Sequence, residues 1–215
     1  MRGRSAVPPD RHAMVEQQLR VRDVADERVL AAMDRVPREL FVPQELRDRA
    51  YDDAALPIGA GQTISQPYMV AKICEALSLR GDEHVLDVGS GSGYQAAVLA
   101  ELAAEVDTIE RIPDLAELAR ANLAAAGYER VRVHLGDGTR GLPERAPFAA
   151  IAVAAAAPRR PQTLYEQLEP RGRLVVPVGR FGIQRLEVIV RSPEGPAVVK
   201  SVPCRFVPLV GEEGF

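Results

Sequence analysis

Residues 84–93 of this chain read His-Val-Leu-Asp-Val-Gly-Ser-Gly-Ser-Gly, and this stretch decides the fold. Its first half has the β-forming character of a strand, and its second half is a glycine-rich turn. Residues 94–100 contain no Gly or Pro and predict a helix. Glycine leaves no Cβ in the way of a ligand, and the start of a helix offers unpaired N–H groups. A strand, a glycine turn and a helix in this order therefore predict a pocket for a nucleotide.

Two acidic residues follow at the ends of the next two predicted strands. Residues 106–110 predict a strand that ends at Glu110, at about the distance past the turn where a ribose-binding carboxylate is expected. Residues 131–135 alternate as a third strand, and Asp137 comes directly after it. We expect Glu110 to accept the ribose hydroxyls and Asp137 to lie beside the adenine amine. Three such loops on successive strands favour a ligand that contains a nucleoside.

Strands and helices alternate through the second part of the chain. A strand is predicted at 149–153, a helix near 162–168 and a strand at 174–178. This alternation predicts an α/β fold with a doubly wound, mostly parallel, seven-stranded sheet and helices on both faces. Two last strands, at 185–191 and 197–202, are joined by the turn-forming sequence Ser-Pro-Glu-Gly-Pro. The sheet is therefore expected to end in an antiparallel C-terminal hairpin.

The first part of the chain is expected to add to this core. Residues 1–9 are typical of a disordered tail, residues 10–80 of an N-terminal helical extension, and residues 81–215 of the core on which it packs. The extension contains a long loop with short extended segments. In that loop, Ser65 is expected to cap a helix that Pro67 opens.

Composition limits the classes of protein that remain. A length of 215 residues is typical of one domain with a sizeable core. A net charge of −3 argues against a nucleic-acid partner, which would favour a basic surface. The chain contains no apolar stretch of membrane-spanning length, and its N-terminus is not typical of a signal peptide, so we expect a cytoplasmic protein with no membrane partner. Cys74 and Cys204 stand far apart, which predicts neither a metal site nor a disulfide framework.

A second informative stretch lies upstream of the glycine turn. Residues 56–70 read Leu-Pro-Ile-Gly-Ala-Gly-Gln-Thr-Ile-Ser-Gln-Pro-Tyr-Met-Val, a glycine-hinged loop placed where it can close over the pocket as a lid. With this loop the chain resembles the protein-L-isoaspartate O-methyltransferases. The G-x-G-x-G turn is general among S-adenosylmethionine-dependent methyltransferases, whereas Thr63-Ile64-Ser65-Gln66-Pro67 is specific to this family. Further matching segments follow in the family's order at 36–42, 87–94, 110–112, 136–138, 146–148, 177–179 and 205–209.

The resemblance implies a Rossmann-like class I methyltransferase with S-adenosyl-L-methionine as its cofactor. The implied partners are isoaspartyl-containing proteins and peptides. Their free carboxylate, or that of a D-aspartyl residue, accepts the methyl group, and the ester then collapses to a succinimide that begins repair. The family's active-site serine falls on Ser65. Its cofactor-binding positions fall on Ile64, Gln66, Pro67, Met69, Asp87, Gly89, Ser90, Gly91, Gly93, Glu110, Arg111, Asp137 and Gly138.

This chemistry needs no general base. A carboxylate acceptor, with an ordinary pKa of about 3.9, is already ionised near pH 7. The histidines His12, His84 and His134 have no motif around them and are expected to be structural. Ser65 is best interpreted as a hydrogen-bond donor that positions the acceptor carboxylate, and not as a covalent nucleophile. Arg205 is expected either to pair with a substrate carboxylate or to cap the sheet.

One position departs from the family's pattern, and it leaves alternatives open. Ala149 stands where the family commonly has Asp, so the loss is either neutral or the sign of an altered pocket wall. The alternatives are a paralogue that methylates an aspartate in one dedicated peptide partner, and a protein that binds the cofactor without activity. The spacing of the glycine turn disfavours an NAD-dependent oxidoreductase. The absence of an Asn-Pro-Pro-Tyr-type loop disfavours a nucleic-acid methyltransferase.

Overall fold

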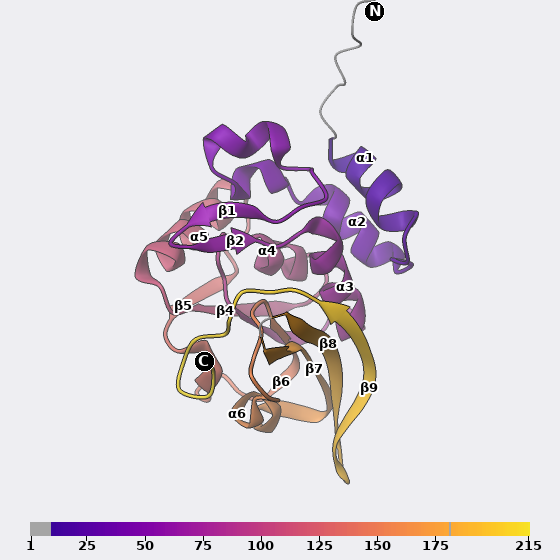
Figure 1. Cartoon of the computed structure of the whole chain (residues 1–215), viewed down its shortest axis with the longest axis vertical. Coiled ribbons are helices and arrows are strands. Elements are labelled where there is room, and N and C mark those ends of the chain that lie inside the picture. The colour runs from indigo at the N-terminus through magenta and orange to yellow at the C-terminus, as the bar shows by residue number, and fades with distance from the viewer. Residues whose placement is uncertain (1–9, 181) are drawn as a thin grey trace, which may run out of the picture.

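A seven-stranded sheet with the strand order β5-β4-β3-β6-β7-β8-β9 forms the centre of the molecule (Figure 1). The computed structural model describes residues 10–180 and 182–215, so the tail predicted at 1–9 lies outside the described residues. Pairing is parallel from β5 to β7 and antiparallel for β7–β8 and β8–β9. The predicted α/β fold with a mostly parallel sheet and an antiparallel C-terminal hairpin is confirmed.

The core alternates strands and helices in chain order. Its elements are β3 (His84–Val88), α4 (Tyr94–Ala100), β4 (Glu105–Glu110), α5 (Pro113–Ala125), β5 (Arg132–Leu135), η4 (Gly138–Arg140), β6 (Phe148–Val153), α6 (Gln162–Glu166), β7 (Leu168–Arg180), β8 (Ile183–Ser192) and β9 (Gly195–Cys204). Helix α4 covers the residues predicted from the sequence. Strand β7 is longer than predicted because β8 pairs with it as far as Arg180.

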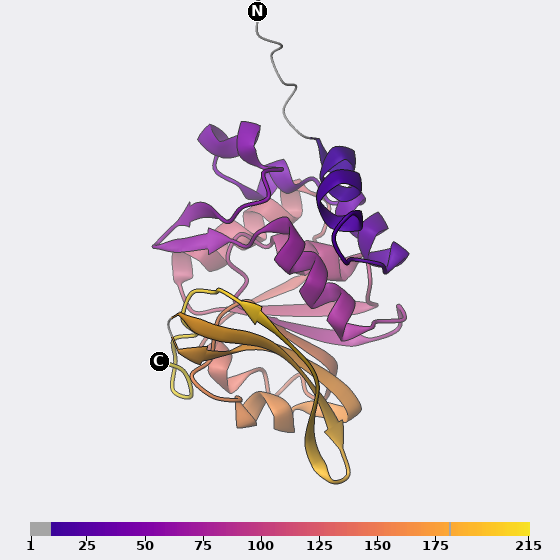
Figure 2. The ribbon, with the colours of Figure 1, turned by 45° about the vertical axis from the view of Figure 1, so that its right-hand side comes forward.

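Each face of the sheet packs against its own apolar cluster. Side chains alternate between the faces along a strand, so Val85 and Val106 join one cluster with α2–α5, while Leu86 and Ile151 join the other with Leu164 of α6. Figure 2 shows these layers, with the orange helix α6 on the opposite side of the sheet from the purple helix α3. Packing on both faces fixes the carboxyl ends of the strands, where the predicted pocket lies.

Residues 10–80 are mostly helical. Their elements are α1 (Arg11–Met14), η1 (Val15–Arg20), α2 (Glu27–Arg35), η2 (Arg38–Phe41), η3 (Gln44–Arg49), β1 (Leu56–Gly59), β2 (Gln62–Ile64) and α3 (Pro67–Leu77). Met14, Leu30 and Phe41 share one apolar cluster with α4, so the extension packs directly on the core. Strands β1 and β2 form an antiparallel hairpin within the loop. Across the described part of the chain, every helix is too short or too polar to span a bilayer.

Ser65 does not cap α3, and the sequence-based prediction was wrong here. The N-cap residue is Gln66, and no side-chain hydrogen bond caps the helix. Proline at the first helical position has no N–H to be capped, and its ring holds φ near the helical value. Because Pro67 starts the helix in this way, Ser65 lies one residue before the cap and lines a cavity instead.

Candidate active site

A cavity opens at the carboxyl ends of β3, β4 and β6, where the loops of the core meet. It encloses about 830 Å³ including its open mouth, within the range of small-molecule sites. The β1–β2 hairpin and the yellow segment after β9 lie on either side of this edge of the sheet in both views (Figures 1 and 2). Both contribute to the lining, the hairpin side through residues 62–65 and the later segment through residues 207–210.

The glycine turn forms the floor of the cavity and needs its glycines. Gly89, Gly91 and Gly93 all have positive φ, at +94°, +52° and +91°, which side-chain-bearing residues rarely adopt. A Cβ on Gly91 would also lie 3.3 Å from the Ile58 Cδ1 atom of the hairpin. The turn leads into α4, whose first residue, Tyr94, lines the cavity. The backbone thus leaves room for a ligand that passes directly over it.

Glu110 lines the cavity at the end of β4, as the ribose-binding prediction requires. Its carboxylate accepts hydrogen bonds from the backbone N–H groups of Gly91 at 3.0 Å, Arg111 at 2.9 Å and Ile112 at 3.0 Å. A carboxylate has about four acceptor positions. Glu110 therefore fastens the glycine turn to β4 and keeps one acceptor position for a ligand, and a second ribose hydroxyl would have to share or replace the Gly91 contact.

Asp87 supports the turn from behind and does not line the cavity, so its contact with the cofactor stays a prediction. It is fully buried and accepts hydrogen bonds from Gln95 Nε2 at 2.7 Å and Thr108 Oγ1 at 2.8 Å. Burial raises the pKa of Asp87 to about 7, although both hydrogen bonds act to lower it. Asp87 thus joins β3, β4 and α4 beneath the turn.

Asp137 does not line the cavity and is held by hydrogen bonds within the protein. Its carboxylate accepts hydrogen bonds from the backbone N–H of Thr139 at 2.9 Å, from the hydroxyl of the same residue at 2.7 Å, and from the backbone N–H of Glu212 at 2.8 Å. Burial alone would raise the pKa of Asp137, but these hydrogen bonds hold it below its usual value. The neighbouring Gly138 lines the cavity in its place. The acid therefore fixes the segment after β9 as part of the wall.

Ser65 lies where the cavity meets a second hollow. That hollow is lined by Gln66, Met69 and residues 205–208, and both spaces share Thr63, Ser65 and Ala154. Arg205 supplies the positive charge in its lining, and carboxylates are absent from the lining residues that the structure describes. One space can hold a nucleoside and the other an anionic group, with the Ser65 residue between them.

The predicted site residues therefore fall into two groups. Those that line the cavity are Ile64, Ser65, Gly89, Ser90, Gly91, Glu110, Arg111 and Gly138. Those that lie next to it or behind it are Gln66, Pro67, Met69, Asp87, Gly93 and Asp137. Residues that line the cavity without having been predicted to bind cofactor include Tyr94, Gln95, Ala155 and residues 207–210. The family resemblance at residues 205–209 was the signal in the sequence that pointed to the lining residues 207–210.

Ala149 lies far from this site. It lines a surface hollow with His84, Glu169 and Arg173 at the opposite end of the strands. The lost carboxylate therefore does not alter a wall of the cavity, and that alternative interpretation was wrong.

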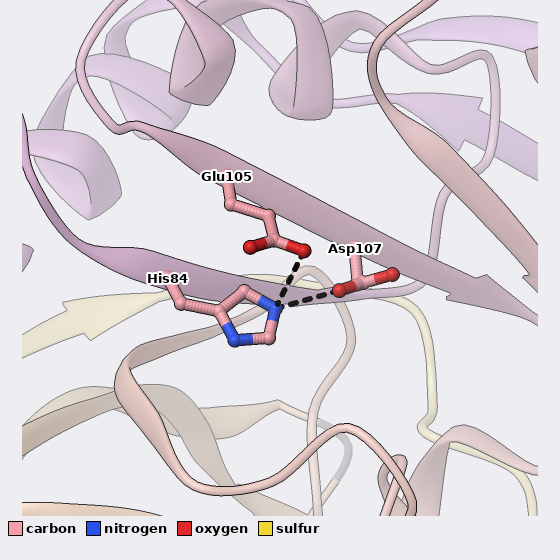
Figure 3. A group of neighbouring side chains, drawn as sticks. All are labelled: His84, Glu105 and Asp107. Carbon is pink, nitrogen blue, oxygen red and sulfur yellow. Dashed lines mark hydrogen bonds and ion pairs between the residues drawn. The ribbon is translucent and has the colours of Figure 1, made fainter.

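His84, Glu105 and Asp107 form a charged cluster that the sequence did not reveal (Figure 3), and His134 joins it through Asp107. Each of the two histidines donates a hydrogen bond from Nε2, at 2.6 Å, to a different carboxylate oxygen of the buried Asp107. Burial would raise the pKa of Asp107, but the hydrogen bonds from the two imidazoles hold it below its usual value. Glu105 lies nearby, so His84, Glu105 and Asp107 bring three metal-ligand atoms within 4.8 Å of one another.

Two arginines form ion pairs with the carboxylates of this cluster. Arg145 contacts both Asp107 and Glu105, and Arg132 pairs with Glu105. A cation would have to displace these guanidinium groups, so the contacts are those of a structural ion-pair network. The cluster lies at the amino ends of β3 and β4, whereas the cavity lies at their carboxyl ends.

The sheet order, the glycine turn and the acid at the end of β4 define a Rossmann-like class I methyltransferase. The family model described as protein-L-isoaspartate(D-aspartate) O-methyltransferase matches residues 10–214. The chain belongs to this family.

Individual relatives agree with the family match. Protein-L-isoaspartate O-methyltransferase 2 of Marinobacter nauticus is 56% identical over 207 residues, which are 95% of this chain and 94% of the relative. A solved structure of a protein-L-isoaspartate O-methyltransferase is 27% identical with a TM-score of 0.85, over 95% of this chain and 67% of that one. A protein of this kind from Plasmodium falciparum, solved with S-adenosyl-L-homocysteine, shares the fold at 24% identity and a TM-score of 0.80, over 94% of this chain and 98% of that one.

Proposed function

We propose that this chain transfers a methyl group from S-adenosyl-L-methionine to the free carboxylate of L-isoaspartyl or D-aspartyl residues in damaged proteins and peptides. The ester then forms a succinimide, which begins repair. The observation that carries the proposal is the position of Ser65, on the wall shared by a nucleoside-sized cavity and a hollow whose lining includes Arg205. The reacting groups of a donor and an anionic acceptor would meet at such a wall.

The residues of the cavity are suited to hold the adenosine part of the cofactor. The turn takes the positive φ that glycine allows, which brings its backbone to the cavity, and Glu110 keeps an acceptor position for a ribose hydroxyl. The S-adenosyl-L-homocysteine bound by the Plasmodium falciparum relative supports this choice of ligand. The bound cofactor supplies an electrophilic methyl group on a positively charged sulfur.

The chain's own residues contribute position and exclusion of water. The acceptor carboxylate is ionised without a base, so no proton has to be moved. The Ser65 hydroxyl donates a hydrogen bond to one carboxylate oxygen and leaves the other oxygen free to attack in line. The hairpin and residues 207–210 cover the reacting atoms, and alignment of this kind contributes up to about 7–11 kcal/mol to catalysis.

The first experiment compares methyl transfer to an isoaspartyl peptide and to its normal aspartyl twin. Transfer to the isoaspartyl peptide alone is expected. Equal transfer to both peptides would support a paralogue that methylates ordinary aspartate. Cofactor binding without transfer to either would support a protein that has lost activity.

Ser65→Ala tests the positioning role. Loss of one hydrogen bond to a charged group costs about 1.5–3 kcal/mol, so kcat/KM for the isoaspartyl peptide should fall about 10- to 100-fold, while the Kd for S-adenosyl-L-homocysteine measured by calorimetry stays within twofold. Ser78→Ala, at the far end of α3, is the matched control. A Ser65→Ala variant as fast as the control would remove Ser65 from the mechanism.

We also propose that the reaction takes place in the cytoplasm. Cys74 and Cys204 are both free thiols, Cys74 fully buried and Cys204 half-buried. Free thiols are usual in a reducing compartment. The acidic net charge argues against nucleic acid as a partner.

A further inference from the structure

Arg38 lies outside the cavity, yet its side chain contacts both halves of the site. It is fully buried on η2. Its Nη2 donates to the backbone carbonyl of Ser65 at 2.8 Å, and its Nε donates to the carbonyl of Ala50 at 2.7 Å. The guanidinium carbon lies 4.7 Å from the centre of the Tyr94 ring, the residue that opens α4 and lines the cavity.

The burial of this charge is not explained by an ion pair. Within residues 10–180 and 182–215, Arg38 forms no ion pair with a carboxylate. Its Nη1 atom has no hydrogen-bond partner among these residues. Desolvation lowers the pKa of Arg38 from its usual value, the direction expected when the charged form is penalised. An apolar residue of similar size would avoid this cost. The reason for arginine must therefore lie in the backbone groups that it holds.

The contact with Ser65 fixes the serine from its backbone. A carbonyl held by a buried guanidinium cannot rotate freely, and the orientation of the peptide plane determines the direction of the attached side chain. Ser65 lies between β2 and the cap of α3, outside the hydrogen-bonding pattern of either element. Arg38 therefore supplies an anchor that secondary structure does not provide at this residue.

The contact with Tyr94 links the same guanidinium group to helix α4, which follows the glycine turn. The Tyr94 ring is also packed edge-on against Phe41, with centroids 5.6 Å apart. We propose that Arg38 is a positioning residue for methyl transfer, which holds Ser65 at a fixed place relative to the helix that carries the cofactor turn. The inference rests on the proposed function, because it assigns to Arg38 the alignment of the serine in that reaction.

The test is a double-mutant cycle between Arg38 and Ser65. Arg38→Met should lower kcat for the isoaspartyl peptide at least tenfold, with the Kd for S-adenosyl-L-homocysteine changed less than threefold. Arg38→Lys, which can still donate to a carbonyl, should recover part of the rate. The variant that combines Arg38→Met with Ser65→Ala should be no more than twofold slower than Ser65→Ala alone, because Arg38 acts through the serine.

Lys72→Met is the matched control for loss of a buried cation. Its ammonium group pairs with Glu75 and Asp23, away from Ser65. The Lys72→Met substitution should lower the melting temperature and leave kcat unchanged. Multiplicative losses in the double variant, or a kcat for Arg38→Met within twofold of wild type, would overturn the inference.

Hydrogen–deuterium exchange on the cofactor-free protein gives a readout without activity. Arg38→Met should speed exchange of the peptide that contains residues 62–66 more than tenfold, and Arg38→Lys should speed it by a smaller factor, with exchange in β6 unchanged in both. The comparison of Arg38→Lys with wild type holds even where Arg38→Met fails to fold, and unchanged exchange of residues 62–66 would also overturn the inference. An inactive wild type, in contrast, would refute the proposed function and leave the exchange result to decide the anchoring.

Discussion

At the scale of single residues, the sequence identified the acids of the site but not their partners. Glu110 lines the cavity, whereas Asp87 and Asp137 do not line it and accept hydrogen bonds from other parts of the protein. A strand-end acid and the loop after it can be recognised from residue order. Which N–H or hydroxyl reaches that acid depends on segments far away, such as Thr108 and Glu212, and residue order does not contain this information.

Asp87 should make the stability of the cofactor-free protein depend on pH. Burial raises the pKa of Asp87 to about 7, so the folded state keeps a proton that the unfolded state loses near pH 4. The free energy of unfolding should therefore fall as pH rises from about 4 to 7. Asp87→Asn removes this titration, and its stability relative to wild type should improve across the window by on the order of a few kcal/mol.

Urea unfolding at pH 4.5, 5.5, 6.5 and 7.5 measures this difference. Leu86→Val, at the preceding buried position, is the control for a change in packing without a change in charge. If Asp87→Asn and wild type differ by the same amount at every pH, the Asp87 carboxyl does not titrate as the burial requires.

At the scale of elements, a helix with a clear start signal was predictable and short paired strands were not. Helix α4 matches its prediction because Gly93 marks its start and residues 94–100 contain no Gly or Pro. The β1–β2 hairpin has a bulge at Pro57/Gly59 and only three or four residues a strand, so alternation gives little signal. The cap at Ser65 was misjudged because Pro67 removes the N–H that a serine would have satisfied.

The segment after β9 should control cofactor affinity through Gly211. A Cβ there would lie 2.1 Å from Asp137 Oδ1 and 2.7 Å from Thr139 Cγ2. Gly211→Ala should push residues 209–210 away from the cavity and weaken the Glu212 hydrogen bond, so the Kd for S-adenosyl-L-homocysteine should rise about tenfold, or 1.4 kcal/mol.

Calorimetric titration of Gly211→Ala against Gly195→Ala isolates this effect. Gly195, at the start of β9, has a positive φ of +109°, unlike Gly211, and nothing lies within 4 Å of its Cβ position. Equal affinities in the two variants would show that the segment does not shape the site.

At the scale of the whole molecule, the two ends of the sheet have different tasks. The carboxyl ends of the strands carry the cavity, and the amino ends carry the cluster around Asp107. His84 and His134 lie on separate strands, and only the register of β3, β4 and β5 brings them to the same acid. The sequence contains no spacing rule for such cross-strand contacts, so the cluster could not be foreseen.

Asp107→Asn should destabilise the protein without slowing methyl transfer. Its pKa is lowered in the folded state, so its contribution is present above the unfolded pKa of about 3.9 and is lost as pH falls below that value. The cost at pH 7 should be about 2–3 kcal/mol, below that of a fully buried pair because Arg145 and His134 are partly exposed.

Thermal unfolding of Asp107→Asn and wild type at pH 3.5 and pH 7 checks this sign. The gap between the two proteins should be smaller at pH 3.5 than at pH 7, while kcat measured well below the melting temperature stays the same. If the stability difference between the two proteins grew at low pH, it would contradict the conclusion that Asp107 is a stabilising carboxylate in the folded state.

The cavity wall draws on residues 62–65 near one end of the chain and on residues 207–210 near the other. A copy in which either part has come loose has no complete wall and should release the cofactor, although its central sheet is still intact. Occupancy of the cavity therefore reports whether the whole chain is correctly assembled. A molecule damaged in either of these two segments would therefore lose activity before it unfolds. A high concentration of cofactor would shift the folding equilibrium of intact molecules toward the folded state by mass action.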